Sequence, residues 1–541
     1  MGPFILFTLF LGATVFPLFA LPFLLSSLLS ILGGTIQSRT SARRELLFSR
    51  AASEEAALPP PSTSSPSDDG DWEKLETSGV LPSSENGKIE DKQWEGVIGF
   101  FHPFCNAGGG GERVLWAAIR ATQARYPRAL CVVYTGDHDV DKHNMLVNVE
   151  SRFNIRLHAP RVVFLYLSTR HYVLASTWPH FTLLGQSLGS IVLAWDAFNL
   201  MAPNVFIDTM GYAFALKACK WLFPEVPTGA YVHYPTISTD MLGSLKDDTG
   251  VKGVNAGLGK GWKGQAKRTY WEIFAWLYCW AGGSVDVVMT NSSWTQSHIM
   301  YLWDPARRRA GKKSAIEVVF PPVAVEELED EIRVDEESEK IRKKDLLYIS
   351  QFRPEKNHQL IITAFAEFMK DRPKSLIPGD DPRLVLVGSV RDDTDKMLVY
   401  KLRVLAREAG VVDHVEFVVN AKWSQILDWL RTSSVGVNGM WNEHFGIGVV
   451  EYQAAGLISV VNDSGGPKED IVVEIDGKPT GFHANTSAEF AAGFEKALAL
   501  SRPDTLAMRL RARKGAKRFT EGEFRKKWVN QLEKLISPSR R

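Results

Sequence analysis

The sequence predicts an α/β protein with two doubly wound, parallel-sheet domains. Short apolar runs of strand length alternate with helix-compatible stretches through both halves of the chain, which is the pattern of repeated βαβ units. The chain has 541 residues, too many for a single hydrophobic core. Glycine-rich turns follow strands in both halves, at the positions where open α/β sheets bind ligands.

Net charge and cysteine spacing indicate which partners and which cellular compartment to expect. The net charge of +1 creates no global field that favours nucleic acid, and no nucleic-acid partner is expected. The four cysteines are too widely spaced for a disulfide framework or a zinc site, which fits a reducing compartment. They are Cys105, Cys131, Cys219 and Cys279.

Residues 1–38 contain no charged residue, and the apolar run Phe4–Leu32 is long enough to cross a bilayer. A cleaved signal peptide is the competing interpretation, but the run is too long for one and lacks a basic start. Pro17 and Pro22 leave a hairpin or re-entrant segment open. Because several arginines follow directly, the positive-inside rule places the rest of the chain in the cytosol. We therefore expect a transmembrane anchor at residues 1–38.

The next segment is expected to be a disordered tether, residues 39–93. The stretch Ala51–Glu95, which covers most of it, is rich in Pro, Ser and acidic residues and cannot bury enough apolar surface to fold alone.

Residues 94–325 are predicted to form the first parallel-sheet domain. A strand at Val97–Phe101, a helix at Val114–Gln123 and a strand at Ala129–Tyr134 make one βαβ unit. Between the first strand and the helix lie four consecutive glycines, which let a ligand approach the backbone; a flexible turn is the alternative. They are Gly108, Gly109, Gly110 and Gly111. Further strands are expected at Asn204–Asp208, Val226–Val232 and Val285–Thr290.

Two segments of this domain have a composition that suits a membrane. Tyr172–Trp195 carries no formal charge but is interrupted by Pro179 and glycines, so a pair of core helices and a membrane-dipping segment both stay open. Thr269–Gly282 is rich in Trp and Tyr, as at a membrane interface, although core packing would also explain it. His233 ends the strand that begins at Val226, where it could face a cleft or be structural.

Residues 326–510 are predicted to form the second doubly wound domain, after a charge-dense junction at Glu326–Lys344. The expected strands are Leu346–Ser350, Arg383–Val387, Val415–Val419, Val435–Val437 and Leu457–Val461. The expected helices are Gln359–Lys370, Asp395–Ala409, Trp423–Arg431, Ser487–Leu500 and Leu506–Leu535. The basic end, residues 511–541, is expected to be a helix that packs back on the first domain; a basic face toward an anionic membrane and a merely solvated face are alternatives.

Two groups of charged residues in the second domain indicate chemistry. Arg353 and Lys356 lie between a strand end and a helix start, where they could neutralise a diphosphate leaving group, or be surface charges. Glu443 and Glu451 flank Gly446 and Gly448 at a predicted helix start. On a helix, eight residues would separate the carboxylates by about 80° and about 12 Å. Bare N–H groups between them suit a phosphate, so the layout matches a sugar nucleotide; an ordinary turn with two solvated glutamates is equally compatible.

Taken together, these motifs resemble the GT-B glycosyltransferases of family 4, which are retaining enzymes with two Rossmann-like domains facing across a cleft. The resemblance runs from Trp94 to the C-terminus. Three stretches, His102–Trp116, Tyr231–Met241 and Asn442–Ile447, closely resemble the GDP-mannose-dependent α-1,2-mannosyltransferases of dolichol-linked oligosaccharide assembly.

This resemblance implies roles for individual residues. It implies a catalytic set of Glu443, Lys356, Arg353 and His233, with Glu443 at the mannose and His233 on the acceptor side. Gly108–Gly111 would approach the diphosphate or the acceptor sugar. The donor-binding set would be Arg353, Lys356, Glu443, His444, Phe445, Gly446, Ile447 and Glu451, with Arg353 and Lys356 on the GDP diphosphate, backbone N–H groups of Phe445–Ile447 on phosphate, and Glu451 on the ribose.

The resemblance also implies an activity and a location. The enzyme would add the fourth and fifth mannoses from GDP-mannose to the dolichol-diphosphate-linked oligosaccharide, on the cytosolic face of the endoplasmic reticulum membrane. Its partners would be GDP-mannose, the lipid-linked acceptor, the bilayer and other enzymes of the same pathway. No cofactor and no metal are expected, since Asp139 and Asp141 lie in a loop away from the motifs. Alternatives are a sister mannosyltransferase, a UDP-sugar-dependent family 4 enzyme, or a non-catalytic GT-B membrane scaffold.

Overall fold

The computed structural model describes residues 2–58, 93–245, 261–370 and 381–537, with the side chains of the first helix described from Leu24 onward. The chain divides into two compact units. Unit 1 comprises residues 1–230, 284–287 and 528–541, and unit 2 comprises residues 231–283 and 288–527.

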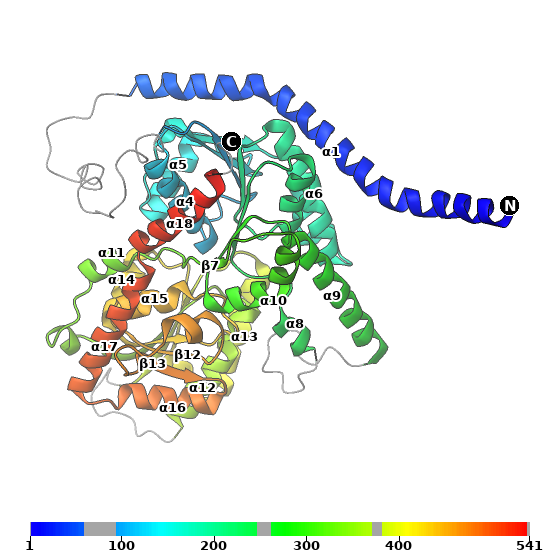
Figure 1. Cartoon of the computed structure of the whole chain (residues 1–541). Coiled ribbons are helices and arrows are strands. Elements are labelled where there is room, and N and C mark those ends of the chain that lie inside the picture. The colour runs from blue at the N-terminus through cyan, green and yellow to red at the C-terminus, as the bar shows by residue number, and fades with distance from the viewer. Residues whose placement is uncertain (1, 59–92, 246–260, 371–380, 538–541) are drawn as a thin grey trace. The chain divides into compact units, whose positions relative to one another are not determined.

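The first half of the chain builds a seven-stranded sheet in the order β3-β2-β1-β4-β5-β6-β7 (Figure 1). The pairs β1–β2, β1–β4, β2–β3, β4–β5 and β6–β7 are all parallel, as the alternation of strands and helices predicted. Its strands are β1 Val97–Phe101, β2 Leu130–Thr135, β3 Val162–Tyr166, β4 Val205–Asp208, β5 Thr228–Val232, β6 Val287–Thr290 and β7 Ile316–Val318. The sequence did not predict β3 and β7.

The helix α1 Gly2–Ala56 precedes the first strand, and the other helices lie between strands. These are α4 Gly110–Arg125, α5 Lys142–Phe153, α6 Thr182–Leu200, α7 Ala213–Leu222, α8 Thr239–Ser244, α9 Gly261–Gly282 and α10 Ser293–Arg309, with 3-10 turns at Ala159–Arg161, Arg170–Val173 and Ala175–Thr177.

The uncharged segment at residues 172–195 forms two short 3-10 turns followed by α6, so the interpretation as a pair of core helices is wrong. Glycines explain how the turns fold onto the helix. A Cβ on Gly189 would lie 2.1 Å from the carbonyl oxygen of Tyr172, and one on Gly185 would overlap the ring of Trp178. Only glycine at these two positions allows the close approach.

The predicted tether is wrong for residues 39–56, which belong to the continuous helix α1 (Figure 1). This part of α1 is fixed to unit 1 by polar contacts that composition does not reveal. Glu55 pairs with Arg161 at 2.6 Å, Glu54 pairs with Lys142 at 3.0 Å, and Arg43 donates to the carbonyl of Leu200 at 2.6 Å. The rest of the predicted tether, residues 59–92, lies outside the described residues.

The predicted anchor falls mostly on side chains outside the described residues, which begin at Leu24. Over the residues that are described, no helix combines the length and the hydropathy of a membrane span.

The second half of the chain builds a six-stranded parallel sheet in the order β10-β9-β8-β11-β12-β13. The second doubly wound domain is therefore confirmed, although β13 was not predicted. Its strands are β8 Lys343–Ile349, β9 Arg383–Gly388, β10 Val415–Val419, β11 Ser433–Asn438, β12 Ile458–Asn462 and β13 Gly481–Ala484. The helices that follow β7 are α11 Val325–Glu331, α12 His358–Met369, α13 Asp393–Glu408, α14 Trp423–Thr432, α15 Ile447–Ala454, α16 Ser487–Leu498, α17 Arg502–Ala516 and α18 Glu521–Ile536.

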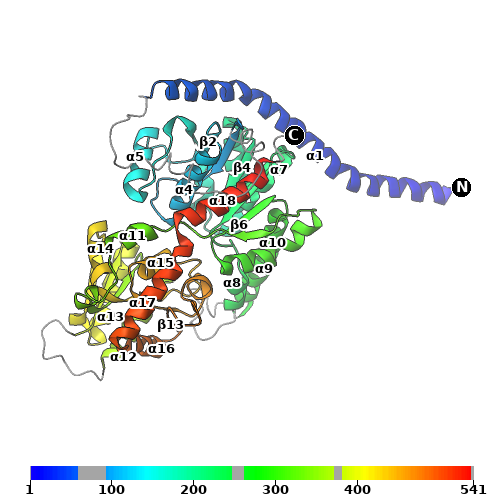
Figure 2. The same ribbon diagram turned by 60° about the vertical axis from the view of Figure 1, so that its left-hand side comes forward.

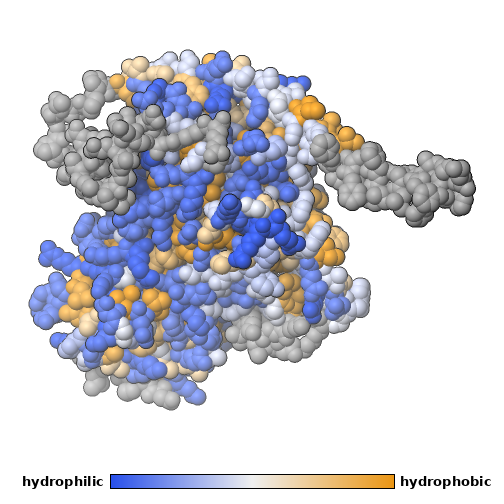
Figure 3. All heavy atoms as spheres, in the orientation of Figure 1, coloured by the Kyte–Doolittle hydropathy of each residue, from blue (hydrophilic) through white to orange (hydrophobic). Residues whose placement is uncertain are grey.

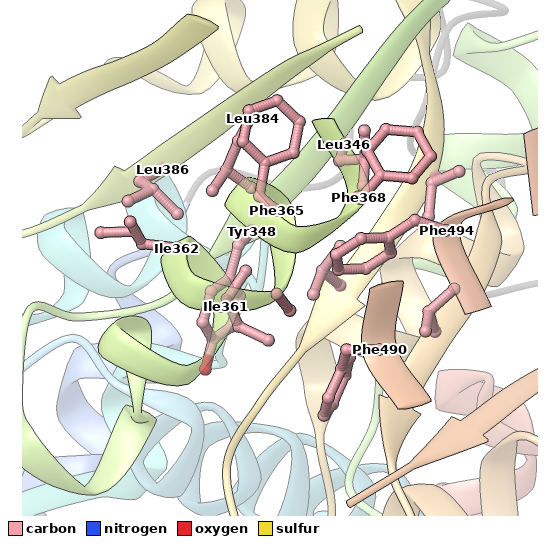
Figure 4. Close-up of a cluster of buried hydrophobic side chains, with 14 of the residues drawn as sticks. Leu346, Tyr348, Ile361, Ile362, Phe365, Phe368, Leu384, Leu386, Phe490 and Phe494 are labelled. Carbon is pink, nitrogen blue, oxygen red and sulfur yellow. The ribbon is translucent and has the colours of Figure 1, made fainter. Parts of the chain in front are cut away.

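Both faces of this sheet are buried, as expected for parallel strands between helices. Along β8, Leu346 and Tyr348 point into one core cluster with α12, α13 and α16, whereas Leu347 points into another with α11, α14 and α15. Figure 4 shows the first cluster, in which phenylalanines of α12 and α16 lie with apolar side chains of β8 and β9. This packing fixes the carboxyl ends of the central strands.

The single helix predicted at residues 506–535 is instead two helices, α17 and α18, separated by a 3-10 turn at Lys517–Phe519 (Figure 2). The turn directs Phe519 into the core, where it packs against Phe320 and Phe445. This burial of an aromatic side chain outweighs the helical periodicity of the sequence.

The end of α18, from Trp528 onward, packs within unit 1. The fully buried ring of Trp528 stacks on Phe100 of β1 at 6.3 Å, and its indole N–H donates to Thr122 of α4 at 3.1 Å. Glu533 pairs with Arg125 at 2.8 Å. The last residues of the chain thereby complete the core around β1 and α4.

Trp528→Ala is expected to destabilise unit 1 by about 3–5 kcal/mol, because it opens a cavity and leaves the Thr122 hydroxyl without its donor. Thermal unfolding followed by calorimetry should show an earlier first transition. The control is Trp262→Ala, since the Trp262 ring is 78% exposed and its removal should change little. Equal transitions for wild type and Trp528→Ala would contradict the prediction.

Candidate active site

A largely buried ion pair joins two of the predicted site residues in unit 2. The ammonium Nζ of Lys356 lies 2.5 Å from Oε2 of Glu443 and 3.1 Å from the sulfur of Met440. Removing both charges from water is costly, so such a pair is weak evidence for stability. Desolvated charges of this kind concentrate at functional sites. The pair therefore marks the candidate site.

The pair lies where two neighbouring strands end. β8 leads into the 3-10 turn Pro354–Lys356, and β11 leads into the segment that carries Glu443. Because β8 and β11 are parallel neighbours, their carboxyl ends meet and bring together residues 87 positions apart. The hydroxyl of Tyr348 donates to the carbonyl of Lys356 at 2.5 Å, which holds the turn.

Glu443 is held in its charged form. Burial acts to raise the pKa of Glu443, but the charge and the hydrogen bond of Lys356 outweigh it, so the pKa lies below its usual value. Burial lowers the pKa of His444 to about 4, so this imidazole is neutral at physiological pH. The site thus presents one carboxylate and one ammonium beside a neutral histidine.

Arg353 belongs to the same turn as Lys356. Its Nη1 lies 3.8 Å from Oε1 of Glu355, a long contact for an ion pair. Its Nε is buried and has no hydrogen-bond partner among the residues that the structure describes. Guanidinium N–H groups bind phosphate well, so this donor could serve an anionic ligand.

The turn into α15 places backbone N–H groups at a helix start. Gly446 caps the helix with φ +104°, a conformation that favours glycine, and α15 begins at Ile447. The ring of Phe445 is buried against Phe320 and Phe519. N–H groups in a first helical turn have no intrahelical acceptor and attract anions.

The prediction that Glu443 and Glu451 lie on one helix is wrong. Glu443 precedes α15, so the rotation expected between it and Glu451 on one helix does not apply. Glu451 lies on the second turn of α15 and is partly buried. Its predicted contact with a ribose stays a prediction.

A second glycine turn, Ser464–Gly466, supports the Glu443 segment, and sequence reasoning gave it no role. The N–H of Gly466 donates to the carbonyl of Glu443 at 2.8 Å, and the N–H of Asn442 donates to the hydroxyl of Ser464 at 2.7 Å. A Cβ on Gly465 would lie 2.3 Å from the carbonyl oxygen of Glu443. The signal for this contact is the pair of adjacent glycines directly after β12.

Aromatic rings surround His444. The ring of Tyr234 stacks on His444 with a centroid distance of 4.7 Å and an angle of 10°, and Trp294 lies 5.4 Å away. The ring centroid of His233 lies 5.0 Å from that of Tyr231, and its predicted place on the acceptor side stays a prediction. The structure therefore places Tyr234, which the sequence did not single out, at the site.

Asp240 adds a polar contact to the same loop. Its carboxylate accepts a hydrogen bond from the side-chain amide of Asn442 at 2.7 Å and lies 3.4 Å from Nε2 of His298. The hydrogen bond and charge of His298 lower the pKa of Asp240 against the effect of burial. Asn442 has φ +52°, an uncommon conformation that this bond and the bond to Ser464 hold.

The glycine segment of unit 1 is partly helical. α4 begins at Gly110 rather than at Val114, so Gly110 and Gly111 form its first turn, and Gly108 adopts φ +82°. The N–H of Gly109 donates to the carboxylate of Glu112 at 2.6 Å. Gly108, Gly109 and Gly110 are exposed, and the carboxylate of Glu112 occupies part of this helix N-terminus. Asp141, set aside as a metal ligand, caps α5 by accepting the N–H of Asn144 at 2.9 Å.

Solved structures with very different sequences share this fold. A crystal structure of Anabaena Alr3699/HepE in complex with UDP and glucose is 15% identical with a TM-score of 0.52, and covers 81% of this chain and 99% of its own. Sucrose-phosphate synthase from Thermosynechococcus elongatus is 13% identical with a TM-score of 0.55, covering 82% and 99%. The two parallel-sheet, Rossmann-like domains thus resemble those of GT-B glycosyltransferases.

Family models match both halves of the chain. The model for the ALG11 mannosyltransferase N-terminus matches residues 95–303, and the model for glycosyl transferases group 1 matches residues 330–519.

Curated relatives match nearly the whole chain. A Neurospora crassa protein named GDP-Man:Man(3)GlcNAc(2)-PP-Dol alpha-1,2-mannosyltransferase is 60% identical over 97% of this chain and 96% of its own length. Proteins of the same name from Homo sapiens and Mus musculus are 43% and 42% identical, over 84% and 86% of this chain and 89% and 91% of their own lengths. This chain therefore belongs to the family of GDP-Man:Man(3)GlcNAc(2)-PP-Dol alpha-1,2-mannosyltransferases.

Proposed function

We propose that this chain transfers α-1,2-linked mannose from GDP-mannose to a dolichol-diphosphate-linked oligosaccharide, adding its fourth and fifth mannoses with retention of configuration. The names of the relatives supply the donor and the acceptor. The observation that carries the proposal to particular residues is the Lys356–Glu443 pair at the start of α15, because it combines a cation for a diphosphate with a carboxylate for a sugar.

Neutralising the leaving diphosphate is the main electrostatic task of the reaction. Arg353 and Lys356 are the cations of the site, and the first-turn N–H groups of α15 add a fixed partial positive charge. Charge that grows on the diphosphate in the transition state is stabilised more strongly than charge in the bound donor. These groups therefore lower the barrier as well as bind GDP-mannose.

Glu443 then acts on the sugar. Its carboxylate stays ionised because Lys356 offsets the effect of burial, so it can accept hydrogen bonds from mannose hydroxyls. The departing diphosphate can take the proton of the acceptor hydroxyl, in which case no protein nucleophile is needed. Glu443 is thus proposed as the residue that holds the mannose while the bond to phosphate breaks.

Donor choice tests this proposal. The full-length chain, incubated with the lipid-linked Man(3)GlcNAc(2) acceptor, should transfer sugar from GDP-mannose and should not transfer sugar from UDP-glucose or UDP-N-acetylglucosamine. Transfer from a UDP-sugar with none from GDP-mannose would favour the UDP-sugar alternative. No transfer from any donor would favour the non-catalytic scaffold.

We further propose that residues 1–38 anchor the enzyme in the endoplasmic reticulum membrane with its catalytic units in the cytosol. The described part of this segment supports an anchor, since Leu24, Leu25, Leu28 and Ile31 are all more than half exposed. In Figure 3 the part of the molecule that adjoins the grey N-terminal atoms is hydrophobic. Carbonate extraction and protease protection of microsomes test both claims. A chain released by carbonate, or one protected from protease, would contradict them.

Asp240→Ala is expected to lower kcat/KM at least about tenfold, because losing a hydrogen bond to a charged group costs about 1.5–3 kcal/mol and frees the Glu443 segment. Asp240→Asn keeps an acceptor for Asn442 and should recover most of the activity. Steady-state kinetics measure both variants. Equal losses in the two variants would show that the charge of Asp240, rather than its hold on Asn442, matters.

A further inference from the structure

A groove between α9 and α10 of unit 2 lies outside the site described above. It has a volume of about 730 Å³ and is lined by Trp276 and Cys279 of α9 and by residues 300–302, 304–306, 308 and 309 of α10. Its walls are apolar and aromatic, and its lining includes two arginines. A groove of this volume could hold a small molecule or part of a lipid.

The apolar wall is exposed to an unusual degree. Trp276, Tyr301 and Met300 are 67%, 71% and 45% exposed. On α9, Ile273 and Trp280 extend the stripe on either side of Trp276 at helical spacing, and both are also exposed. The opposite face of α9 buries Trp271, Phe274 and Tyr278, so the helix is apolar on both sides. Contiguous exposed apolar surface of this kind marks a binding site.

The cationic part of the groove lies at the end of α10. Arg308 pairs with Asp304 at 2.6 Å, and Nε of Arg309 donates to the carbonyl of Pro305 at 3.1 Å. Arg309 is close enough for its charge to oppose the effect of burial on the pKa of Cys279. Two guanidinium groups against one carboxylate leave a net positive charge, and the planar fork of arginine matches phosphate oxygens.

α10 connects this groove with the candidate active site. At its start, the N–H and hydroxyl of Ser293 donate to Asp470 at 2.8 and 2.6 Å, and Trp294 lies beside His444. Fourteen residues separate Trp294 from Arg308, a rise of about 21 Å along the helix. A ligand that reached from one end of α10 to the other would therefore need several sugar units between its anionic group and its reacting end.

We propose that the α9/α10 groove binds the diphosphate and the first isoprene units of the lipid-linked acceptor. This inference rests on the proposed function, in which the acceptor joins a diphosphate and an isoprenoid chain to a five-sugar glycan, Man(3)GlcNAc(2). Arg308 and Arg309 bind the diphosphate, and Trp276, Met300 and Tyr301 bind the isoprenoid. The glycan then runs along α10 toward Glu443. The donor diphosphate is bound elsewhere, at Arg353 and Lys356.

The test compares two acceptors that carry the same glycan, one on an isoprenoid diphosphate and one on a neutral alkyl glycoside. The full-length chain is assayed with GDP-mannose in detergent micelles free of anionic lipid. Arg308→Gln with Arg309→Gln should lower kcat/KM for the diphosphate acceptor about tenfold or more, a loss of about 1.4 kcal/mol or more of binding. The kcat/KM for the alkyl glycoside acceptor and the KM for GDP-mannose should stay as in the wild type.

Matched variants on α13 control for loss of surface charge and of exposed apolar area. Lys401→Gln with Arg407→Gln removes two exposed cations, and Met397→Ala with Tyr400→Ala removes side chains that are 53% and 63% exposed. These variants should behave as wild type. The double variant Met300→Ala with Tyr301→Ala should lower kcat/KM for the diphosphate acceptor, as the double arginine variant does.

Three results would overturn the assignment. If the wild type is active and the arginine variant discriminates between the two acceptors as the wild type does, the groove does not bind the diphosphate. The assay is repeated in vesicles that contain anionic lipid. If the variants match the wild type in micelles and lose activity only in these vesicles, equally for both acceptors, the groove binds the membrane surface instead. If the wild type transfers no mannose to either acceptor, the proposed function itself fails.

Discussion

Glu443→Ala is expected to lower kcat for mannose transfer by about 10³-fold while the enzyme still binds GDP. The carboxylate is the charged acceptor of the site, held ionised by Lys356 at 2.5 Å. Losing one preorganised electrostatic group in a water-poor site typically costs about 10²–10³ in kcat. The loss should fall on kcat because the proposed contact is with the sugar and not with the nucleotide.

Glu443→Gln and Glu416→Ala make this result interpretable. The amide of Gln keeps an acceptor for Lys356 but removes the charge, so it should stay inactive while folding as wild type. Glu416 lies on β10, in the same sheet as β11, and pairs with Arg383 of β9 at 3.5 Å. Glu416→Ala therefore tests the effect of deleting a paired carboxylate outside the candidate site. Activity is measured with labelled GDP-mannose, and GDP binding by calorimetry. Retention of more than about a tenth of the activity in Glu443→Ala would remove this residue from the site.

Lys356→Met is expected to have the second largest effect, through two separable consequences. Loss of the ammonium should weaken GDP-mannose binding and lower kcat/KM by about 10²-fold, since hydrogen bonds to charged groups contribute about 1.5–3 kcal/mol. The substitution also removes the charge that opposes the effect of burial on Glu443. The pKa of Glu443 should then rise.

The pH profile reports this second consequence. In the wild type the pKa of Glu443 lies below its usual value, so its protonation should reduce activity only in acid. When the Lys356 charge is removed, it no longer offsets the effect of burial on the pKa of Glu443, so the acid limb of kcat/KM should move to higher pH. Lys356→Arg keeps the charge and should keep the position of the limb. An acid limb that does not move in Lys356→Met would show that the two residues are not coupled.

Sequence patterns predicted those parts of the fold that repeat locally. The central strands of both sheets are short apolar runs, and the Glu443 segment lies between β11 and α15 as predicted. Among the missed strands, β7 (Ile-Glu-Val) and β13 (Gly-Phe-His-Ala) are not continuous apolar runs. The strand β3 has five residues, as β1 does, so its length does not explain why it was missed. Residues 39–56 were assigned to the tether from composition, whereas ion pairs to Arg161 and Lys142 hold them in a helix.

The candidate site was predicted only where a motif is continuous in sequence. Arg353, Lys356 and Glu443 follow strand ends, and that position is readable from the chain. Asp240 contacts Asn442 across 202 residues, and no periodicity or spacing encodes such a contact. Tyr234 was overlooked beside His233 because a histidine attracts a catalytic interpretation and a tyrosine before a proline does not. The structure was needed to find the ring that stacks on His444.

The most direct test of the central claim is the linkage of the product. The purified full-length chain is incubated with GDP-mannose and lipid-linked Man(3)GlcNAc(2). The glycan is then released from the lipid, and its mass is measured by mass spectrometry before and after digestion with an α-1,2-specific mannosidase. We predict that wild type adds two mannoses, that the mannosidase removes both, and that Glu443→Ala adds none. If the mannosidase does not remove the added mannoses from the wild-type product, the proposed function is contradicted. If Glu443→Ala is as active as the wild type, the proposed site is contradicted.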